Sequence, residues 1–288
     1  MLLEALQPLH ADAARRAAAV ETFSALANVR MATREGLLAF GARSGFDAQL
    51  LTLWRALGLL QRAQVPAGTL ATDLVDVLAL TPAGARELTH ATGTVARGIS
   101  PVRFKRSGRK LLHDASLGDA ALAILAAARE GLLDLVGVET DDRMLSTSAV
   151  VTSPGAHPAR VPLQPDGYVV ARDKGRLRGL LLELDRDTIS PVKMAAKYAA
   201  YFAWQAQGGP ERAFGVKATR LLTIVPNASR LKRLHDAAFR ATGEHRSGFF
   251  LFVEAEHLTA RDPARLVEPI VTVLGDTTKI PLFPPTSS

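Results

Sequence analysis

The chain has 288 residues, of which 48% are hydrophobic, enough to fill one large core or two ordinary ones. It has no cysteine, which excludes disulfides, thiolate catalysis and cysteine zinc sites and fits a reducing cytoplasm. A formal net charge of +7 suits an anionic partner, most simply nucleic acid, although Arg- and Ala-rich proteins also carry such a balance for compositional reasons. Because no run of about 18 uncharged apolar residues is present, we expect a cytoplasmic protein without a membrane partner.

The first part of the chain predicts a winged helix-turn-helix domain over residues 1–96. The helical spacing of apolar residues predicts three helices, at 12–29, 32–42 and 46–60. Two strand-like runs, 59–65 and 74–81, flank a turn-rich segment and predict a hairpin. A closing helix follows, with Thr81 as N-cap and Pro82 at its first position.

The third of these helices is the candidate DNA-reading helix, N-capped by Ser44 or a residue near it. Its apolar stripe is expected to face the core: Leu50, Leu53, Trp54 and Leu57. The opposite side, its N-terminus and the wing supply candidates for base edges or phosphates: Arg43, Ser44, Gln49, Thr52, Arg55 and Arg62. This face is less basic than many DNA readers, so a winged helix that only mediates dimerisation is the alternative.

Residues 97–112 are predicted to be a basic linker, because Gly, Ser and Pro are frequent there and no acid interrupts the cations of 97–110. The candidates for phosphate contact are Arg103, Lys105, Arg106, Arg109 and Lys110, together with Arg97. Cations on such a segment release counterions when they bind DNA, whereas the plainer interpretation is a solvated linker.

Residues 113–288 predict a second, α/β domain. Its expected helices are 116–134, 190–207 and 228–243, and its expected strands are 144–151, 159–172 (broken by Pro165), 178–185, 219–226 and 248–258. Apolar strands with helices between them favour a mixed sheet that is covered on both faces.

Three acidic residues near two of these strands are candidates for chemistry. Glu183 and Asp185 are two apart, so they share one face of their strand, and Asp166 stands at the start of the preceding one. If the two strands pair as a hairpin, Asp166 and Glu183 lie side by side and could bind Mg²⁺ or Mn²⁺. The alternative is a solvated strand end, with Asp187 and Thr188 forming the turn into the next helix.

The helix that follows carries Lys193, Lys197 and Tyr201 at spacings of four, which places them on one face. If that face turns towards the carboxylates, a lysine could hold a phosphate or the attacking water. A solvated helix face is the plainer explanation for the lysines, as packing is for the tyrosines.

These features resemble the PD-(D/E)xK nuclease superfamily, in which a strand carrying Asp is followed by a strand that ends in an acidic residue, a spacer and a lysine. Here the corresponding residues are Asp166, Glu183 and Leu184, and Asp185 occupies the lysine position. Some members take the lysine from the neighbouring helix, so the resemblance allows Lys197 or Lys193 to substitute. Otherwise it implies a nuclease fold without nuclease activity.

A resemblance to the replication-relaxation family of mobile bacterial elements covers most of the chain. It rests on the order of the winged helix, His113, Pro165-Asp166-Gly167, the segment 183–188 and the lysines and tyrosines of 193–201. His113, beside the predicted linker, is a hinge contact, a phosphate contact or without a role. The resemblance implies plasmid replication, DNA relaxation or mobilisation.

We therefore expect a DNA-binding protein of a plasmid or mobile element that acts in replication, mobilisation or transcriptional control on duplex DNA as a homodimer. Its restriction-endonuclease-like domain would be inactive or, in the competing interpretation, a Mg²⁺-dependent DNA endonuclease. In that enzyme Asp166 and Glu183 would bind the metal, Asp185 would assist and Lys197 would orient the nucleophile. A pure protein-interaction module is a third class.

Overall fold

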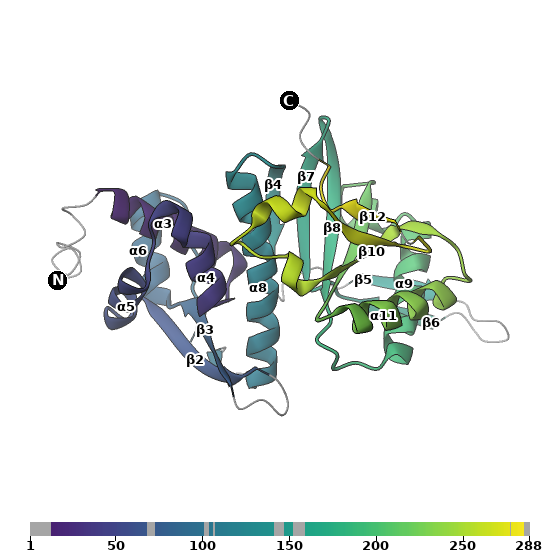
Figure 1. Ribbon diagram of the computed structural model, residues 1–288, viewed down its shortest axis with the longest axis horizontal. Helices are drawn as coiled ribbons and strands as arrows, with labels where there is room; N and C mark the ends of the chain where they lie inside the picture. Colours follow the sequence, from purple (N-terminus) through teal and green to yellow (C-terminus); the bar gives the residue numbers. More distant parts are fainter. Residues whose placement is uncertain are drawn as a thin grey trace. The chain divides into compact units, whose positions relative to one another are not determined.

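The computed structural model describes residues 13–67, 73–100, 104–105, 107–140, 147–151, 159–276 and 278–284 (Figure 1). The chain forms two compact units. The first comprises Met1–Ala126 and Thr259–Pro263, and the second comprises Ala127–Leu258 and Ala264–Ser288.

The first unit is a winged helix-turn-helix. Its elements are α3 (Ala13–Val29), β1 (Ala32–Thr33), α4 (Arg34–Gly41), η1 (Ala42–Ser44), α5 (Ala48–Ala56), β2 (Leu60–Pro66), β3 (Leu74–Leu80) and α6 (Pro82–Thr92). Both β1 and β2 pair antiparallel with β3, which gives the strand order β1-β3-β2. Three helices, a β2–β3 hairpin and a closing helix confirm the fold predicted for this part of the chain.

Local capping explains where these helices begin. The Thr33 side chain accepts a hydrogen bond from the Gly36 amide at the start of α4, and Thr81 does the same for α6. Helix α5 is capped by Asp47, which accepts from two backbone amides, and not by Ser44. The cap lies three residues after Ser44 because the chain first makes a 3-10 turn, and the helix starts at Ala48 instead of at residue 46.

The apolar side of α5 packs into the core of this unit. Trp54 stacks on Phe23 with ring centroids 3.7 Å apart, and Phe46 meets Phe23 edge-on at 5.2 Å. Leu51 is buried with Leu50, whereas Leu53 is only partly buried. The buried stripe is therefore rotated slightly about the helix axis relative to the predicted one.

Helix α8 (Gly108–Arg129) is longer at its N-terminus than the predicted helix 116–134. Leu111, Leu112 and Ala115 are buried with Met31 and other residues of the first unit, which extends the helix through the end of the predicted linker. Length and composition would allow α8 to cross a membrane, but 67% of its apolar window is buried within the protein, as in the core helix of a soluble protein.

The second unit is built on a mixed sheet. Its elements are β4 (Asp134–Glu139), β5 (Thr147–Val151), β6 (Ala159–Leu163), β7 (Gly167–Asp173), β8 (Arg176–Leu184), α9 (Pro191–Ala206), α10 (Gly209–Phe214), β9 (Thr219–Val225), α11 (Ala228–Ala241), β10 (Ser247–Glu254), η2 (Ala255–His257), η3 (Pro263–Val267), β11 (Pro269–Leu274) and β12 (Lys279–Pro281). The seven-stranded sheet has the order β12-β11-β10-β9-β8-β7-β4, and β5 pairs with β6 separately. Strands β8, β9 and β10 are mutually parallel and the other pairs are antiparallel, which confirms the predicted α/β class with a mixed sheet.

The expected break of 159–172 at Pro165 is confirmed, since β6 ends at Leu163 and β7 begins at Gly167. Other predicted boundaries in this unit were wrong. The expected helix 116–134 ends at Arg129, Gly131 adopts a φ of +73°, and an edge strand, β4, follows. Strands β11 and β12 and helix α10 were not predicted at all.

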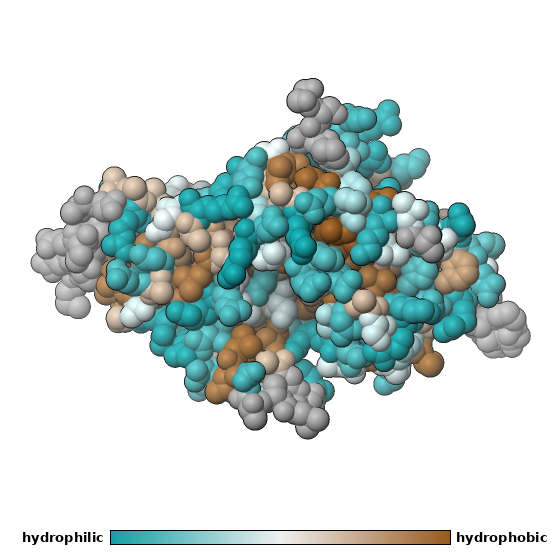
Figure 2. Space-filling view, in the orientation of Figure 1, coloured by the Kyte–Doolittle hydropathy of each residue, from teal (hydrophilic) through white to brown (hydrophobic). Residues whose placement is uncertain are grey.

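Both faces of the sheet are buried. Leu181 and Leu221 point to one face and Leu182 and Leu222 to the other, and all four are fully buried. On the first face, Tyr198, Tyr201 and Trp204 of α9 join a core with Phe250 and Phe252 of β10. Helices α9 and α11 lie along this side of the sheet (Figure 1). On the side of the protein shown in Figure 2, most of the surface is hydrophilic, and the apolar patches are smaller.

Candidate functional site

Pairing between β7 and β8 brings Asp166 and Glu183 together. Gly167 is registered with Leu182, so Asp166 falls opposite Glu183. The Asp166 amide donates to the Leu182 carbonyl (2.9 Å), and Asp166 Oδ2 accepts from the Leu184 amide (2.8 Å). The predicted hairpin is therefore confirmed, and its backbone bonds fix the Asp166 carboxylate at the end of β8.

Glu183 is the centre of the site, and only 4% of it is exposed. From α9, Lys197 Nζ donates to Glu183 Oε1, and Tyr201 Oη donates to Glu183 Oε2 at 3.3 Å. The one-turn spacing of Lys197 and Tyr201 thus places both on the face that meets the carboxylate. The cluster of Asp166, Glu183, Lys197 and Tyr201 is called the acidic–lysine site below.

The electrostatics of this site oppose a second negative charge. Burial, followed by the neighbouring Asp166 charge, raises the pKa of Glu183 to about 7, although the Lys197 ammonium and the hydrogen bonds from Lys197 and Tyr201 act in the opposite direction. Burial also raises the pKa of Tyr201 well above its usual value, so this phenol stays neutral and donates its hydrogen. A cation placed between the two carboxylates would relieve their repulsion.

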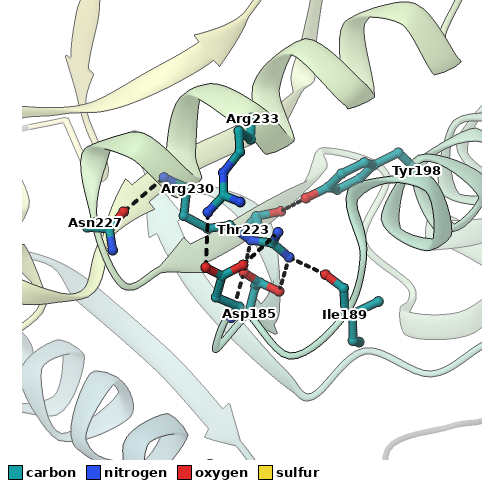
Figure 3. Close-up of polar contacts among 8 residues, drawn as sticks. Asp185, Ile189, Tyr198, Thr223, Asn227, Arg230 and Arg233 are labelled. Carbon is teal, nitrogen blue, oxygen red and sulfur yellow. Dashed lines mark hydrogen bonds and ion pairs between the residues drawn. The ribbon is translucent and has the colours of Figure 1, made fainter. Parts of the chain in front are cut away.

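Asp185 has a different environment although it shares the strand face of Glu183. Arg230 of α11 holds it through two bonds, Nε to Oδ2 at 2.6 Å and Nη2 to Oδ1 at 2.8 Å, and both side chains are 1% exposed (Figure 3). The same guanidinium donates to the Ile189 carbonyl and pairs with Asp187 at 2.9 Å. Asp185 is therefore fully occupied in tying the segment between β8 and α9 to α11.

The remaining candidates of this unit lie around the site. Lys193 is exposed one turn before Lys197, and Ser190 caps the helix through the Lys193 amide. Tyr198 donates to Thr223 Oγ1 (3.2 Å) within the core, which makes it a packing residue. In the first unit, His113 lies on α8 with Nδ1 3.3 Å from Asp114.

Most of the winged-helix candidates already have intramolecular partners. Ser44 donates to Glu21, Arg62 pairs with Asp76 across the hairpin at 2.6 Å, and Arg43 donates to the Arg261 carbonyl. These three side chains would have to exchange a protein partner for a phosphate.

The outer face of α5 is more accessible. Gln49, Thr52 and Arg55 are exposed, as predicted. Gln49 accepts from Arg15 at 3.4 Å and Thr52 donates to the Ala48 carbonyl of its own helix. The Arg55 side chain has no hydrogen bond or ion pair among the described residues, and its guanidinium is thus ready for an anion.

The structure revises the predicted basic linker. Arg109 and Lys110 belong to the first turn of α8, and Lys110 pairs with Asp114 at 2.7 Å. Lys105 is exposed. Arg103 and Arg106 lie outside the described residues. Arg97 keeps its carbonyl bonded to the Arg30 guanidinium.

A divalent metal fits this site in the kind and number of its carboxylates. Mg²⁺ commonly binds through one or two carboxylates and keeps several waters, and Asp166 and Glu183 supply two. Among the described residues, no group of three His, Asp or Glu side chains is placed to hold a metal ion. Asp185, the nearest further carboxylate on the strand, is engaged by Arg230. Lys197 would compete with a metal for Glu183.

Fold and site together define a winged-helix protein with a mixed α/β unit that holds the acidic–lysine site. The family model described as replication-relaxation matches residues 23–217, and the chain belongs to the replication-relaxation family. Membership indicates a role in the replication or relaxation of a plasmid or mobile element. No curated protein and no solved structure matches the chain.

Sequence reasoning missed Arg230. It lies 45 residues beyond Asp185, on a helix whose other basic residues are exposed. The only local signal was the position of Arg230 in the first turn of α11, close to the Asn227 cap. At this position the side chain points towards the sheet.

Proposed function

We propose that this protein binds duplex DNA through its winged-helix unit and acts in replication, mobilisation or transcriptional control of a mobile element. The observation that carries the proposal is the outer face of α5, where Gln49, Thr52 and Arg55 are exposed on the helix that such folds place in the major groove. The net charge of +7 and the family membership support the same partner. A homodimer reading a two-fold site is the expected bound form.

A gel-shift titration against duplex DNA at several salt concentrations tests this proposal. We expect affinity to fall steeply with salt, because phosphate contacts release counterions. Replacing Arg55 by Ala removes an unpaired guanidinium and is expected to weaken binding by roughly 5- to 150-fold, the range of about 1–3 kcal/mol for a base contact. Arg86→Ala, on the exposed side of α6, is the matched control. A salt-independent affinity, or equal losses in both variants, would contradict the proposal.

Sedimentation of the complex gives the number of chains per DNA duplex. Two chains on a symmetric site support the homodimer, and one chain contradicts it.

A second candidate function is a Mg²⁺- or Mn²⁺-dependent DNA endonuclease. The observation that favours it is the convergence of Asp166, Glu183 and Lys197 at the ends of β7 and β8. A bound metal would polarise the scissile phosphate. Asp166 and Glu183 would hold it, and Lys197 would stabilise negative charge on the phosphate after leaving Glu183.

Incubation of supercoiled plasmid with Mg²⁺ or Mn²⁺ tests this candidate. Nicking by the wild type that is lost in Asp166→Asn and in Glu183→Gln would support it. Lys193→Gln is the control, because this exposed lysine lies on the same helix one turn away and contacts neither carboxylate. Nicking that survives in both carboxylate variants would come from another source, and no nicking leaves a DNA-binding protein with an inactive nuclease-like unit.

A further inference from the structure

The end of the β7–β8 hairpin in the second unit carries a dense set of cations that neither the winged helix nor the acidic–lysine site uses. The set, called the hairpin cluster, consists of Arg172, Lys174, Arg176, Arg178 and Arg220. All five are exposed, and the acids at this end of the sheet are Asp173 and, on β4 in register with Arg172, Asp134. This end is opposite to the end that carries Asp166 and Glu183, because Gly167 and Leu184 lie at the far ends of the two strands.

Strand geometry places three of these arginines on one surface. Arg176 and Arg178 are two residues apart on β8, so their side chains point to the same face and their Cα atoms are about 7 Å apart. Arg220 on β9 is registered with Leu180, which shares that face. The β8–β9 pairing begins at Gly179, so residues 176–178 extend past the neighbouring strand β9.

These positive charges are mostly uncompensated. Arg178 pairs with Asp173 at 3.3 Å with half of its side chain exposed, which makes the bridge weak. Within the described parts of the chain, the other four cations have no hydrogen bond or ion pair of their side chains. Partial burial and the nearby Arg178 charge lower the pKa of Arg220, and the Asp173 charge acts in the opposite direction, so like charges lie close together here with one acid beside them. An anionic ligand would remove their repulsion.

The spacing fits a polyanion better than a single small anion. Guanidinium groups reach bidentately to phosphate oxygens, and three of them on a flat sheet surface can contact separate phosphates. A DNA strand carries one phosphate per roughly 3.4 Å of helix axis. Two arginines about 7 Å apart on β8 can therefore contact every second phosphate along one strand. Such a contact requires no apolar groove or aromatic platform, since it carries no sequence information.

We propose that the hairpin cluster is a second DNA-contacting surface, which binds the phosphate backbone of duplex DNA independently of base sequence. The choice of duplex DNA as ligand rests on the proposed function, whereas the anion-binding property rests on the cluster itself. Such a surface adds affinity to the winged helix through a shared ligand and leaves base recognition to α5.

The test compares two full-length double variants that remove the same charge. Arg176→Gln/Arg220→Gln removes two unpaired cations of the cluster, and Lys232→Gln/Arg240→Gln removes two exposed cations of α11. For nonspecific duplex DNA, we expect the cluster variant to reduce the slope of log K against log salt by about 1.8, that is about 0.9 for each phosphate that the variant no longer neutralises. The α11 variant is expected to keep the wild-type slope, and Arg176→Lys/Arg220→Lys to restore most of it.

The outcomes separate the two proposals. A wild type that does not bind duplex DNA removes the proposed function and this inference with it. A wild type that binds, with an unchanged slope in the cluster variant or an equal loss in the α11 variant, overturns the inference alone. Loss of binding to vesicles of anionic phospholipid, with unchanged DNA binding, would also overturn it in favour of a membrane surface. Far-ultraviolet circular dichroism confirms that each variant is folded.

Discussion

Each unit holds a carboxylate at a junction between distant segments, and the two carboxylates are satisfied in different ways. In the first unit, Asp119 of α8 accepts from the Thr33 amide (2.9 Å) and the Thr33 hydroxyl (2.7 Å). In the second, Asp185 is held by the buried guanidinium of Arg230. Burial without a cation raises the pKa of Asp119 to about 7, with Glu35 adding to the shift. One junction is therefore sensitive to pH, whereas the other depends on keeping both members of an ion pair.

The comparison also bears on function. Asp185 has the acidic character that a metal site needs, but Arg230 already neutralises it. Glu183, two residues earlier, accepts from a lysine and a phenol and lies beside the Asp166 carboxylate. The partner that each carboxylate meets, and not its position on the strand, decides whether it is available for a ligand.

The largest expected effect follows from removing the cation of the second unit. Arg230→Met leaves Asp185 buried without a partner, and we expect the free energy of unfolding to fall by about 3–5 kcal/mol. Equilibrium urea denaturation measures this change. A double variant, Arg230→Met/Asp185→Leu, removes both charges and should recover a large part of the loss. If the double variant loses as much stability as Arg230→Met and Asp185→Leu lose together, the interaction between the two side chains does not contribute.

The first unit should respond to pH. The pKa of Asp119 is about 7 when folded against 3.8 for the ordinary carboxyl, so between these values the folded chain holds a proton that the unfolded chain does not. The contribution of Asp119 to stability is complete below about pH 4 and is lost as the pH rises to about 7, by at most about 4 kcal/mol.

Urea denaturation at pH 4.5, 6 and 8 measures this loss. Asp119→Asn keeps an acceptor for the Thr33 amide, reverses the bond with the Thr33 hydroxyl and carries no titrating proton, so it is expected to flatten this part of the pH profile. An unchanged profile in Asp119→Asn would assign the pH dependence to other groups.

A smaller effect is expected where α4 approaches α8. Gly36 has no side chain, and a Cβ there would lie 2.1 Å from Asp119 Oδ1. Gly36→Ala should therefore destabilise the chain by about 1–3 kcal/mol, the usual range for overpacking, although Ala favours a helix by about 1 kcal/mol over Gly. Thermal unfolding measures the difference. Combined with Asp119→Ala, which makes room for the methyl group, the substitution should become neutral or stabilising.

The smallest effect is expected at an exposed pair on α11. Lys232 contacts Asp236 at 3.0 Å, and 79% of the lysine side chain is exposed. Lys232→Gln is expected to change the free energy of unfolding by no more than about 0.5 kcal/mol. Urea denaturation of this variant and of Arg230→Met compares a surface cation with a buried cation on the same helix. A fall above about 1 kcal/mol would contradict the role given to burial.

The sequence by itself determined the local structure of both units and the pairing that forms the site. Caps such as Thr33, Thr81 and Ser190 act within one helical turn, and an apolar stripe has the period of its own helix. The hairpin of β7 and β8 joins neighbouring segments, so the closeness of Asp166 and Glu183 followed from strand order. The spacing of Lys197 and Tyr201 then showed that they share a face.

Only the tertiary structure decided which of these groups are already engaged. Arg230 meets Asp185 across 45 residues and Thr33 meets Asp119 across 86, and no period in the sequence links such partners. Strand β4 was missed for the same reason, because this edge strand takes its conformation from hydrogen bonds to β7, which is distant in sequence. The hairpin cluster likewise exists only because β9 brings Arg220 beside Arg178, and the free energy of a charged group depends on what packs against it.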